Sequence, residues 1–162
     1  PFITLMPAFA GEILKGGSHT YGFVMSSTGA GALLGAFYLA SKKDTKGLGK
    51  SIGLFTVMLG LSLVALGFAN HLWMAVMIGF FAGLSMISAI ASINTLLQTI
   101  TDESKRGRVM SFYAMALMGM HPIGNLMSGT IASGMGISNT LMVSGLVTIL
   151  SGLWFSGSKS LS

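Results

Sequence analysis

The chain has 162 residues, of which 52% are hydrophobic and 8% charged, with a net charge of +5 and a mean hydropathy of +0.78. About a quarter of the residues in a soluble domain are charged, so this chain has too few charges to cover a surface that faces water, and lipid is the simplest alternative. Cysteine is absent, which excludes disulfides and thiolate metal sites, and no carboxylate pair or His–Glu cluster has the spacing of metal ligands.

Six apolar segments follow one another along the chain. They cover residues 1–13, 21–40, 51–69, 72–97, 109–132 and 137–155. A bilayer core of about 30 Å needs about 20 helical residues, so the last five segments are long enough to span it. The first is too short, and we expect it to be the outer end of a longer, truncated helix. Because the segments lack the alternation of strands, they predict an all-α membrane protein with six transmembrane helices.

The basic residues indicate how these segments cross the membrane. If successive segments alternate in direction, eight of the nine Lys and Arg residues lie on one side, in the loops 41–50 and 99–108 and in the tail after residue 155. Lys15 alone lies on the other side. Because basic loops remain in the cytoplasm, we expect a multi-pass protein of the bacterial inner membrane with both chain ends cytoplasmic. This placement fits membrane topology better than a nucleic-acid-binding surface.

Glycine occurs 23 times, and some of its spacings are informative. Gly31 and Gly35 are four residues apart, as are Gly79 and Gly83. Small residues at this spacing allow the backbones of two membrane helices to approach closely. The alternative is a face that lines a substrate path, but close packing is the main use of such residues in membranes, and we favour it.

Polar side chains inside the predicted spans are the first candidates for function, because they are costly in a bilayer. Asn94 lies near the cytoplasmic end of one span, and His121 and Asn125 lie in the middle of the next. We expect these three residues to line a substrate cavity. The side chain of His121 can exchange a proton near neutral pH during transport. The alternative, more common for a lone histidine, is a neutral imidazole that is hydrogen-bonded to a neighbouring helix.

Pro122, in the same span, predicts a kink. Proline removes a backbone hydrogen bond from its helix, so the freed carbonyl near His121 must find a partner or face a cavity. A kink beside a polar pair is a moving part in one interpretation and a packing device in the other, and both fit the sequence.

The densest cluster of charges lies in the loop at residues 101–108. Thr101 is placed to cap a helix, and Asp102 and Arg106 are four residues apart with the acid first, which is the favourable order for a helical ion pair. The cluster is either a solvated loop that fixes the topology or an ionic latch between helical bundles. The latch candidates are Asp102, Arg106 and Arg108.

The residues on either side of this loop carry a family resemblance. They are NTLLQT at 94–99, Asp102-Glu103 and RGRVMS at 106–111, followed by Gly119, PIG at 122–124 and Gly129. Together they resemble the Major Facilitator Superfamily, and most closely the branch of bacterial exporters that includes the enterobactin exporter. PAFA at 7–10 and Tyr21-Gly22 are similar to the end of helix seven and the start of helix eight in that branch.

The resemblance implies that the chain is the C-terminal half, helices seven to twelve, of a twelve-helix transporter that works by alternating access. It implies secondary, proton-linked efflux of a drug-like or siderophore-like small molecule, without a cofactor, and an N-terminal transporter half as partner within the lipid bilayer. The alternative from another class is a non-transporting fragment or assembly module that needs a partner half. An enzyme is not expected, because no nucleophile, metal or acid–base constellation is visible.

Overall fold

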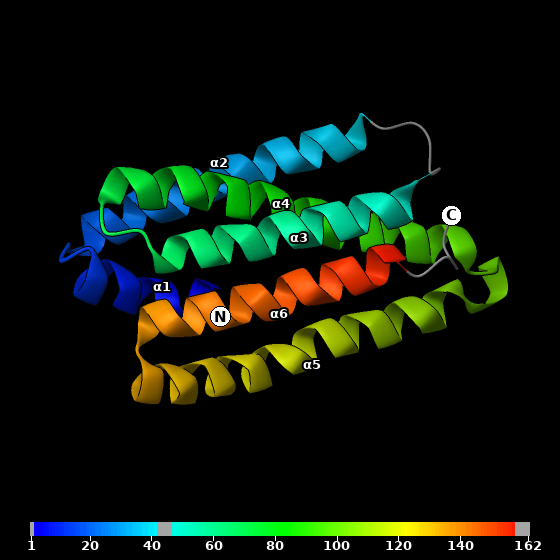
Figure 1. Cartoon of the computed structure of the whole chain (residues 1–162). Coiled ribbons are helices and arrows are strands. Elements are labelled where there is room, and N and C mark those ends of the chain that lie inside the picture. The colour runs from blue at the N-terminus through cyan, green and yellow to red at the C-terminus, as the bar shows by residue number, and fades with distance from the viewer. Residues whose placement is uncertain (1, 42–46, 158–162) are drawn as a thin grey trace.

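The described part of the computed structural model, residues 2–41 and 47–157, contains helices and no strand (Figure 1). The elements are α1 (Phe2–Ala8), the π-helical turn η1 (Phe9–Ile13), α2 (Ser18–Ala40), α3 (Leu48–Gly67), α4 (Leu72–Ile100), α5 (Glu103–Met135) and α6 (Ile137–Gly157). Much of the predicted basic loop at 41–50, with Lys42, Lys43 and Lys46, and Lys159 in the tail lie outside the described residues.

Four of the helices, α2, α3, α4 and α6, are long and apolar enough to cross a membrane. They confirm the prediction of an all-α membrane protein. The fifth long helix, α5, has 33 residues and is less apolar. It begins at Glu103, six residues before the predicted start at 109, because the charged residues of the loop form its first turns. Charged turns of this kind fit a helix that is longer than the hydrocarbon core and extends beyond it.

The first seam of close contact joins α2 to α4. A Cβ atom added at Gly35 would lie 2.6 Å from the backbone oxygen of Leu84 and 2.7 Å from the hydroxyl of Ser88, so only glycine fits there. Gly31 and Gly83 meet the backbone of the partner helix in the same way. The two helices run parallel, and their backbones touch where the spacing of the four glycines predicted close packing.

A second glycine seam, which was not predicted, joins α3 to α6. Gly60 and Gly145 face each other, since a Cβ added at Gly145 would lie 2.6 Å from the backbone oxygen of Gly60. Gly53 and Gly67, each seven residues from Gly60, meet the opposite ends of α6, so the two helices are antiparallel. Seven residues are about two helical turns, which keeps these glycines on one face. The directions of both seams agree with the predicted alternation of sides.

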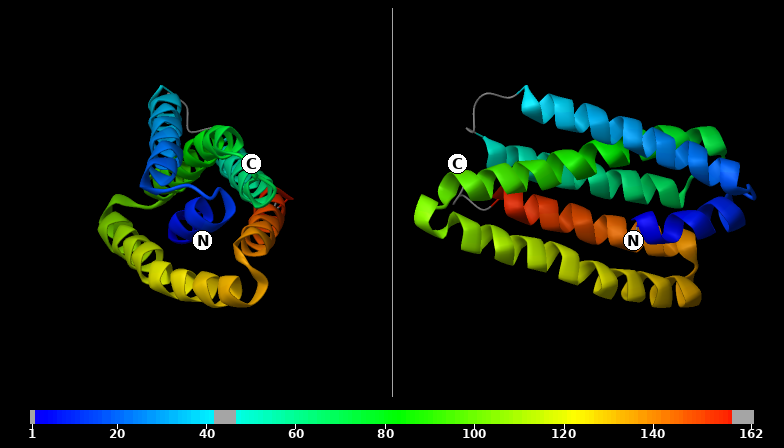
Figure 2. Two further views of the ribbon diagram at one scale, coloured as in Figure 1. Left: turned by 90° about the vertical axis from the view of Figure 1, so that its left-hand side faces the viewer. Right: turned by 180° about the vertical axis from the view of Figure 1, so that it is seen from behind.

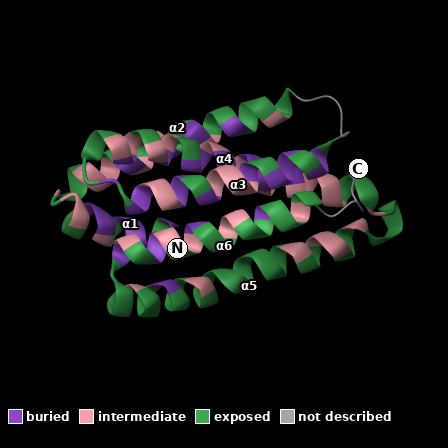
Figure 3. Cartoon of the chain, in the orientation of Figure 1, coloured by how far each residue is buried: buried purple, intermediate pink, exposed green. Residues whose placement is uncertain are grey.

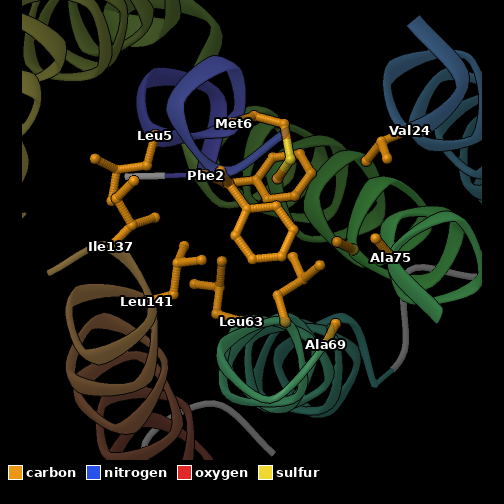
Figure 4. Close-up of a cluster of buried hydrophobic side chains, with 12 residues drawn as sticks. Phe2, Leu5, Met6, Val24, Leu63, Ala69, Ala75, Ile137 and Leu141 are labelled. Atoms are coloured by element: carbon orange, nitrogen blue, oxygen red, sulfur yellow. The ribbon is translucent and has the colours of Figure 1, made fainter. Parts of the chain in front are cut away.

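The short helix α1 lies among the longer helices, as the end-on view in Figure 2 shows. Its buried residues are Phe2, Leu5 and Met6, and Phe9 continues the same face into η1. These side chains pack against the following buried residues elsewhere in the chain (Figure 4): Val24, Leu63, Leu66, Ala69, Ala75, Ala82, Ile137 and Leu141. The hydrophobic core therefore lies where α1 fills the groove between α3, α4 and α6, with Val24 of α2 beside it.

Helix α5 differs from the others, because Ser128 is its only buried residue. Figure 3 shows α5 exposed along almost its whole length, whereas α3 and α4 carry continuous buried faces. The described chain thus consists of a frame formed by the packed pairs α2–α4 and α3–α6, of α1 inserted between these helices, and of α5, most of whose surface no other described residue covers.

The α2–α4 seam predicts the effect of one added methyl group. Alanine at Gly35 must displace the backbone of α4, and we expect G35A to lower the free energy of unfolding by about 1–3 kcal/mol. The matched control is G29A on the same helix, where an added Cβ meets nothing within 4 Å. Both variants gain the same helix propensity of about 1 kcal/mol, so their difference isolates the seam. Equal unfolding free energies in mixed SDS–detergent micelles would contradict the assignment.

Candidate functional site

A polar face runs along the middle of α5. His121, Asn125 and Ser128 are spaced by four and three residues, so they lie on one side of the helix. Ser128 is buried and donates to the backbone oxygen of Gly124 at 2.7 Å, whereas His121 and Asn125 are exposed. Exposed imidazole and amide groups in the middle of a membrane helix are costly against lipid. This face therefore needs a water-filled cavity or another protein segment beside it.

The structure adds Thr4 of α1 to this face. The Thr4 hydroxyl donates a hydrogen bond of 2.6 Å to the side-chain oxygen Oδ1 of Asn125. Thr4 was not among the predicted cavity residues, although it is the only hydroxyl residue in the apolar segment 1–13 and is polar within a predicted span, as Asn94 and Asn125 are. The pairing of Thr4 with Asn125 cannot be predicted from the sequence pattern, because the two residues are 121 positions apart.

Asn94 lies elsewhere in the bundle. Its side-chain oxygen accepts a hydrogen bond from Gln98, one turn further along α4. Helices α4 and α5 meet at residues 101–102, and at 1.5 Å per residue Asn94 lies roughly 10 Å from this junction while Asn125 lies roughly 30 Å along α5. The structure thus brings Asn125 together with His121 and Thr4, and places Asn94 at a different depth.

Pro122 lies within α5, which is helical on both sides of it. Its ring nitrogen carries no proton, so the backbone oxygen of Met118 lacks the N–H group that would ordinarily bond to it. Both His121 and Pro122 are exposed, and the predicted kink stays a prediction.

The charged loop is organised differently from the prediction. Thr101 donates its hydroxyl to the backbone oxygen of Leu97 and ends α4, so Thr101 is not the cap of the next helix. Asp102 takes that position, and its backbone oxygen accepts from the N–H groups of Lys105 and Arg106, both at 3.0 Å.

The predicted pairing of Asp102 with Arg106 is not formed. Asp102 has a ψ angle of 144° and stands outside the helix, so the geometry of residues four apart in a helix does not apply to it. Within the described residues the carboxylate of Asp102 has no ion pair, and the Nε atom of Arg106 is buried without a hydrogen-bond partner. Arg108 is exposed.

An apolar cavity of about 430 Å³ opens between α3, α4 and α6, near the charged loop. Its lining residues are Ile52, Thr56, Ile93, Leu96, Leu97, Ile100, Ser151, Gly152 and Phe155. It continues the groove that α1 occupies: Thr56 lies seven residues before Leu63, and Gly152 lies eleven after Leu141, spacings that return to the same helix face. The groove is thus filled at one end by α1 and open at the other.

These features define a class of protein. Apolar helices long enough to span a bilayer, joined through glycine seams, with a polar face in the middle of α5, are typical of a multi-pass membrane protein. Within the described residues, no group of three His, Asp or Glu side chains is placed to hold a metal ion.

Comparison with known families identifies the chain more closely. The model of the family described as transmembrane secretion effector, within the Major Facilitator Superfamily, matches residues 2–159, and the chain belongs to this family. The resemblance to the superfamily seen in the sequence is confirmed. Membership of a family of transporters also confirms the prediction that the chain is not an enzyme.

Individual relatives are similar over nearly the whole chain. The Staphyloferrin A transporter of Staphylococcus aureus is 26% identical over 148 residues, which are 91% of this chain and 37% of that protein. The uncharacterized MFS-type transporter YvqJ of Bacillus subtilis is 26% identical over 157 residues, 94% of this chain and 36% of its own length. The chain spans little more than a third of the length of these relatives. No solved structure matches it.

Proposed function

We propose that this chain forms the C-terminal six-helix half of a twelve-helix secondary transporter, which moves a small molecule by alternating access. The observation that carries the proposal is the polar face of Thr4, His121 and Asn125, exposed on a protein that presents many large apolar side chains to its surroundings. Membership of a transporter family and the match to little more than a third of its relatives support it. In such a transporter the two halves enclose the substrate site near the membrane midplane.

The open groove supports the interpretation of α1 and η1 as part of a longer span. Together they cover Phe2–Ile13, which is too short to cross a bilayer core of about 30 Å. A helix that continues the axis of α1 enters the apolar cavity between α3, α4 and α6. With that segment in place, α1, α2, α3, α4, α5 and α6 make six spans.

The orientation follows from the charges. The junction of α4 with α5 carries Lys105, Arg106 and Arg108, and the positive-inside rule assigns this end of the bundle to the cytoplasm. Both chain ends then belong to the cytoplasmic side of the bacterial inner membrane. At the same end, Arg106 and Arg108 are available as donors for an ionic latch with carboxylates of the other half, and Asp102 as an acceptor.

The proposed cargo is a siderophore-like or drug-like small molecule, exported at the expense of the proton gradient. The name of the Staphyloferrin A transporter supports the siderophore-like class. Met118, which is exposed and lies three residues before His121 on the same side of α5, supports a hydrophobic cargo, because its flexible side chain adapts to varied shapes. Asn125 and His121 then form one wall of the cavity, and Asn94 lines its cytoplasmic end.

A second candidate function is an assembly module that moves nothing by itself. The observation that favours it for the isolated chain is α5, which leaves nearly all of its surface without contacts inside the described structure. A partner half is needed in either case, so the two functions differ in whether the completed protein transports.

Transport by the full-length parent protein separates these candidates. We expect bacterial cells that express the parent to export staphyloferrin A or ethidium faster than cells with an empty vector, and a protonophore to abolish the difference. Cells that express residues 1–162 alone, with membrane insertion checked by fractionation, are expected to show no export. If neither compound is exported faster by the parent, both cargo classes are wrong; export that persists with the protonophore contradicts proton linkage.

His121 provides a test of proton coupling. In the described structure no carboxylate is paired with His121, so we expect its imidazole to act through a hydrogen bond that it donates or accepts. H121Q retains this capacity without titrating, and its transport between about pH 6 and pH 8 is expected to match the parent. The matched variant H121L loses the hydrogen bond, and its rate should fall roughly threefold to tenfold. Loss of the pH response in H121Q would instead make His121 the proton carrier.

A further inference from the structure

The Thr4 hydroxyl forms a hydrogen bond between two helices. Hydroxyl groups in membrane helices commonly donate to the backbone oxygen four residues earlier, which satisfies them within their own helix. Thr28, Thr56 and Thr148 do this at 2.8, 2.7 and 2.7 Å. Thr4 donates to the side chain of Asn125 on another helix, at 2.6 Å, and the position four residues before Thr4 precedes residue 1 of the sequence.

The bond determines which groups Asn125 has left to offer. An asparagine amide has one oxygen that accepts and one nitrogen with two protons that donate. Because Oδ1 of Asn125 faces the Thr4 hydroxyl, the Nδ2 group is directed away from α1. No protein partner for Nδ2 occurs within the described residues, and Asn125 is exposed. The amide therefore presents donors on its free side.

The hydrogen bond between Thr4 and Asn125 also fixes α5 at a point where few other side chains contact this helix. Ser128, one turn from Asn125, is the only buried residue of α5, and Ala132 packs against the hydrophobic core around α1. The Thr4 bond lies at the edge of this small contact. On the α1 side the backbone is irregular, because Pro7 interrupts the hydrogen-bond pattern and η1 follows. A side-chain bond is thus the specific link between two helices that pack weakly.

We infer that Thr4 is a positioning residue, which holds the Asn125 amide so that its two N–H groups face the cargo. The inference rests on the proposed function, in which Asn125 lines the cavity. It assigns to the cargo a complementary acceptor, a carbonyl or carboxylate oxygen. Thr4 acts through Asn125 and does not itself contact the cargo.

The first test is an NMR measurement of the side-chain amide signal of Asn125. The full-length parent is labelled with ¹⁵N at asparagine and placed in lipid nanodiscs. The Asn125 side-chain signal is identified by its loss in N125L. We expect T4V, which removes the hydroxyl at nearly constant shape, to shift and broaden this signal, and T4S to preserve it. T148V is the matched control, because the Thr148 hydroxyl bonds only within α6 in the described structure.

Transport kinetics provide the second readout, with whichever of staphyloferrin A and ethidium the parent exports. T4V is expected to raise KM roughly threefold to tenfold with kcat within about twofold, and T4S to restore KM. If T4V does not fold, T4A replaces it. An unchanged Asn125 signal in T4V, or an unchanged KM, overturns the inference. If the parent transports neither compound, the proposed function and the cargo contact fall together, while the NMR signal still decides whether Thr4 orients the amide.

Discussion

Close contact between helix backbones is the constraint on which the rest of this structure depends. In lipid, apolar side chains gain little by leaving their surroundings, so helices associate through packing that brings their backbones together. The α2–α4 and α3–α6 pairs achieve this through glycine, and at Gly35, Gly60 and Gly145 even one methyl group would overlap the partner helix. The two pairs form a rigid frame, since α3 also packs against α4.

The frame leaves two places where the molecule is incomplete by itself. One is the groove between α3, α4 and α6, which α1 fills at one end only. The other is α5, whose polar face is linked to α1 through Thr4 and Asn125 and whose remaining surface is exposed. A stable frame with an adaptable helix beside it suits alternating access, in which rigid units move against each other around a fixed site.

Much of the fold was accessible from the sequence, because hydropathy and length identify spans such as α2 and α4, and four-residue glycine spacings identify a packing face. The α3–α6 seam was missed although Gly53, Gly60 and Gly67 carry the same kind of signal at seven residues. The helical pairing of Asp102 with Arg106 was predicted wrongly, because Asp102 lies just before α5 and not inside it, and this position decides which residues are its neighbours. The Thr4–Asn125 bond depends on how distant segments pack, which periodicity does not contain.

The central claim is that this frame is one half of a larger transporter, with a helix in the open part of its groove. Residues 1–162 contain no cysteine, so the thiol of a single L97C substitution reports how accessible the groove is at this position. Any cysteines elsewhere in the parent are first replaced. We would measure its reaction rate with a thiol reagent in the isolated chain and in the full-length parent, with L153C, exposed on α6, as control. The account predicts that L97C reacts readily in the isolated chain and is protected in the parent, while L153C reacts equally in both. Equal reactivity of L97C in the two proteins would contradict it.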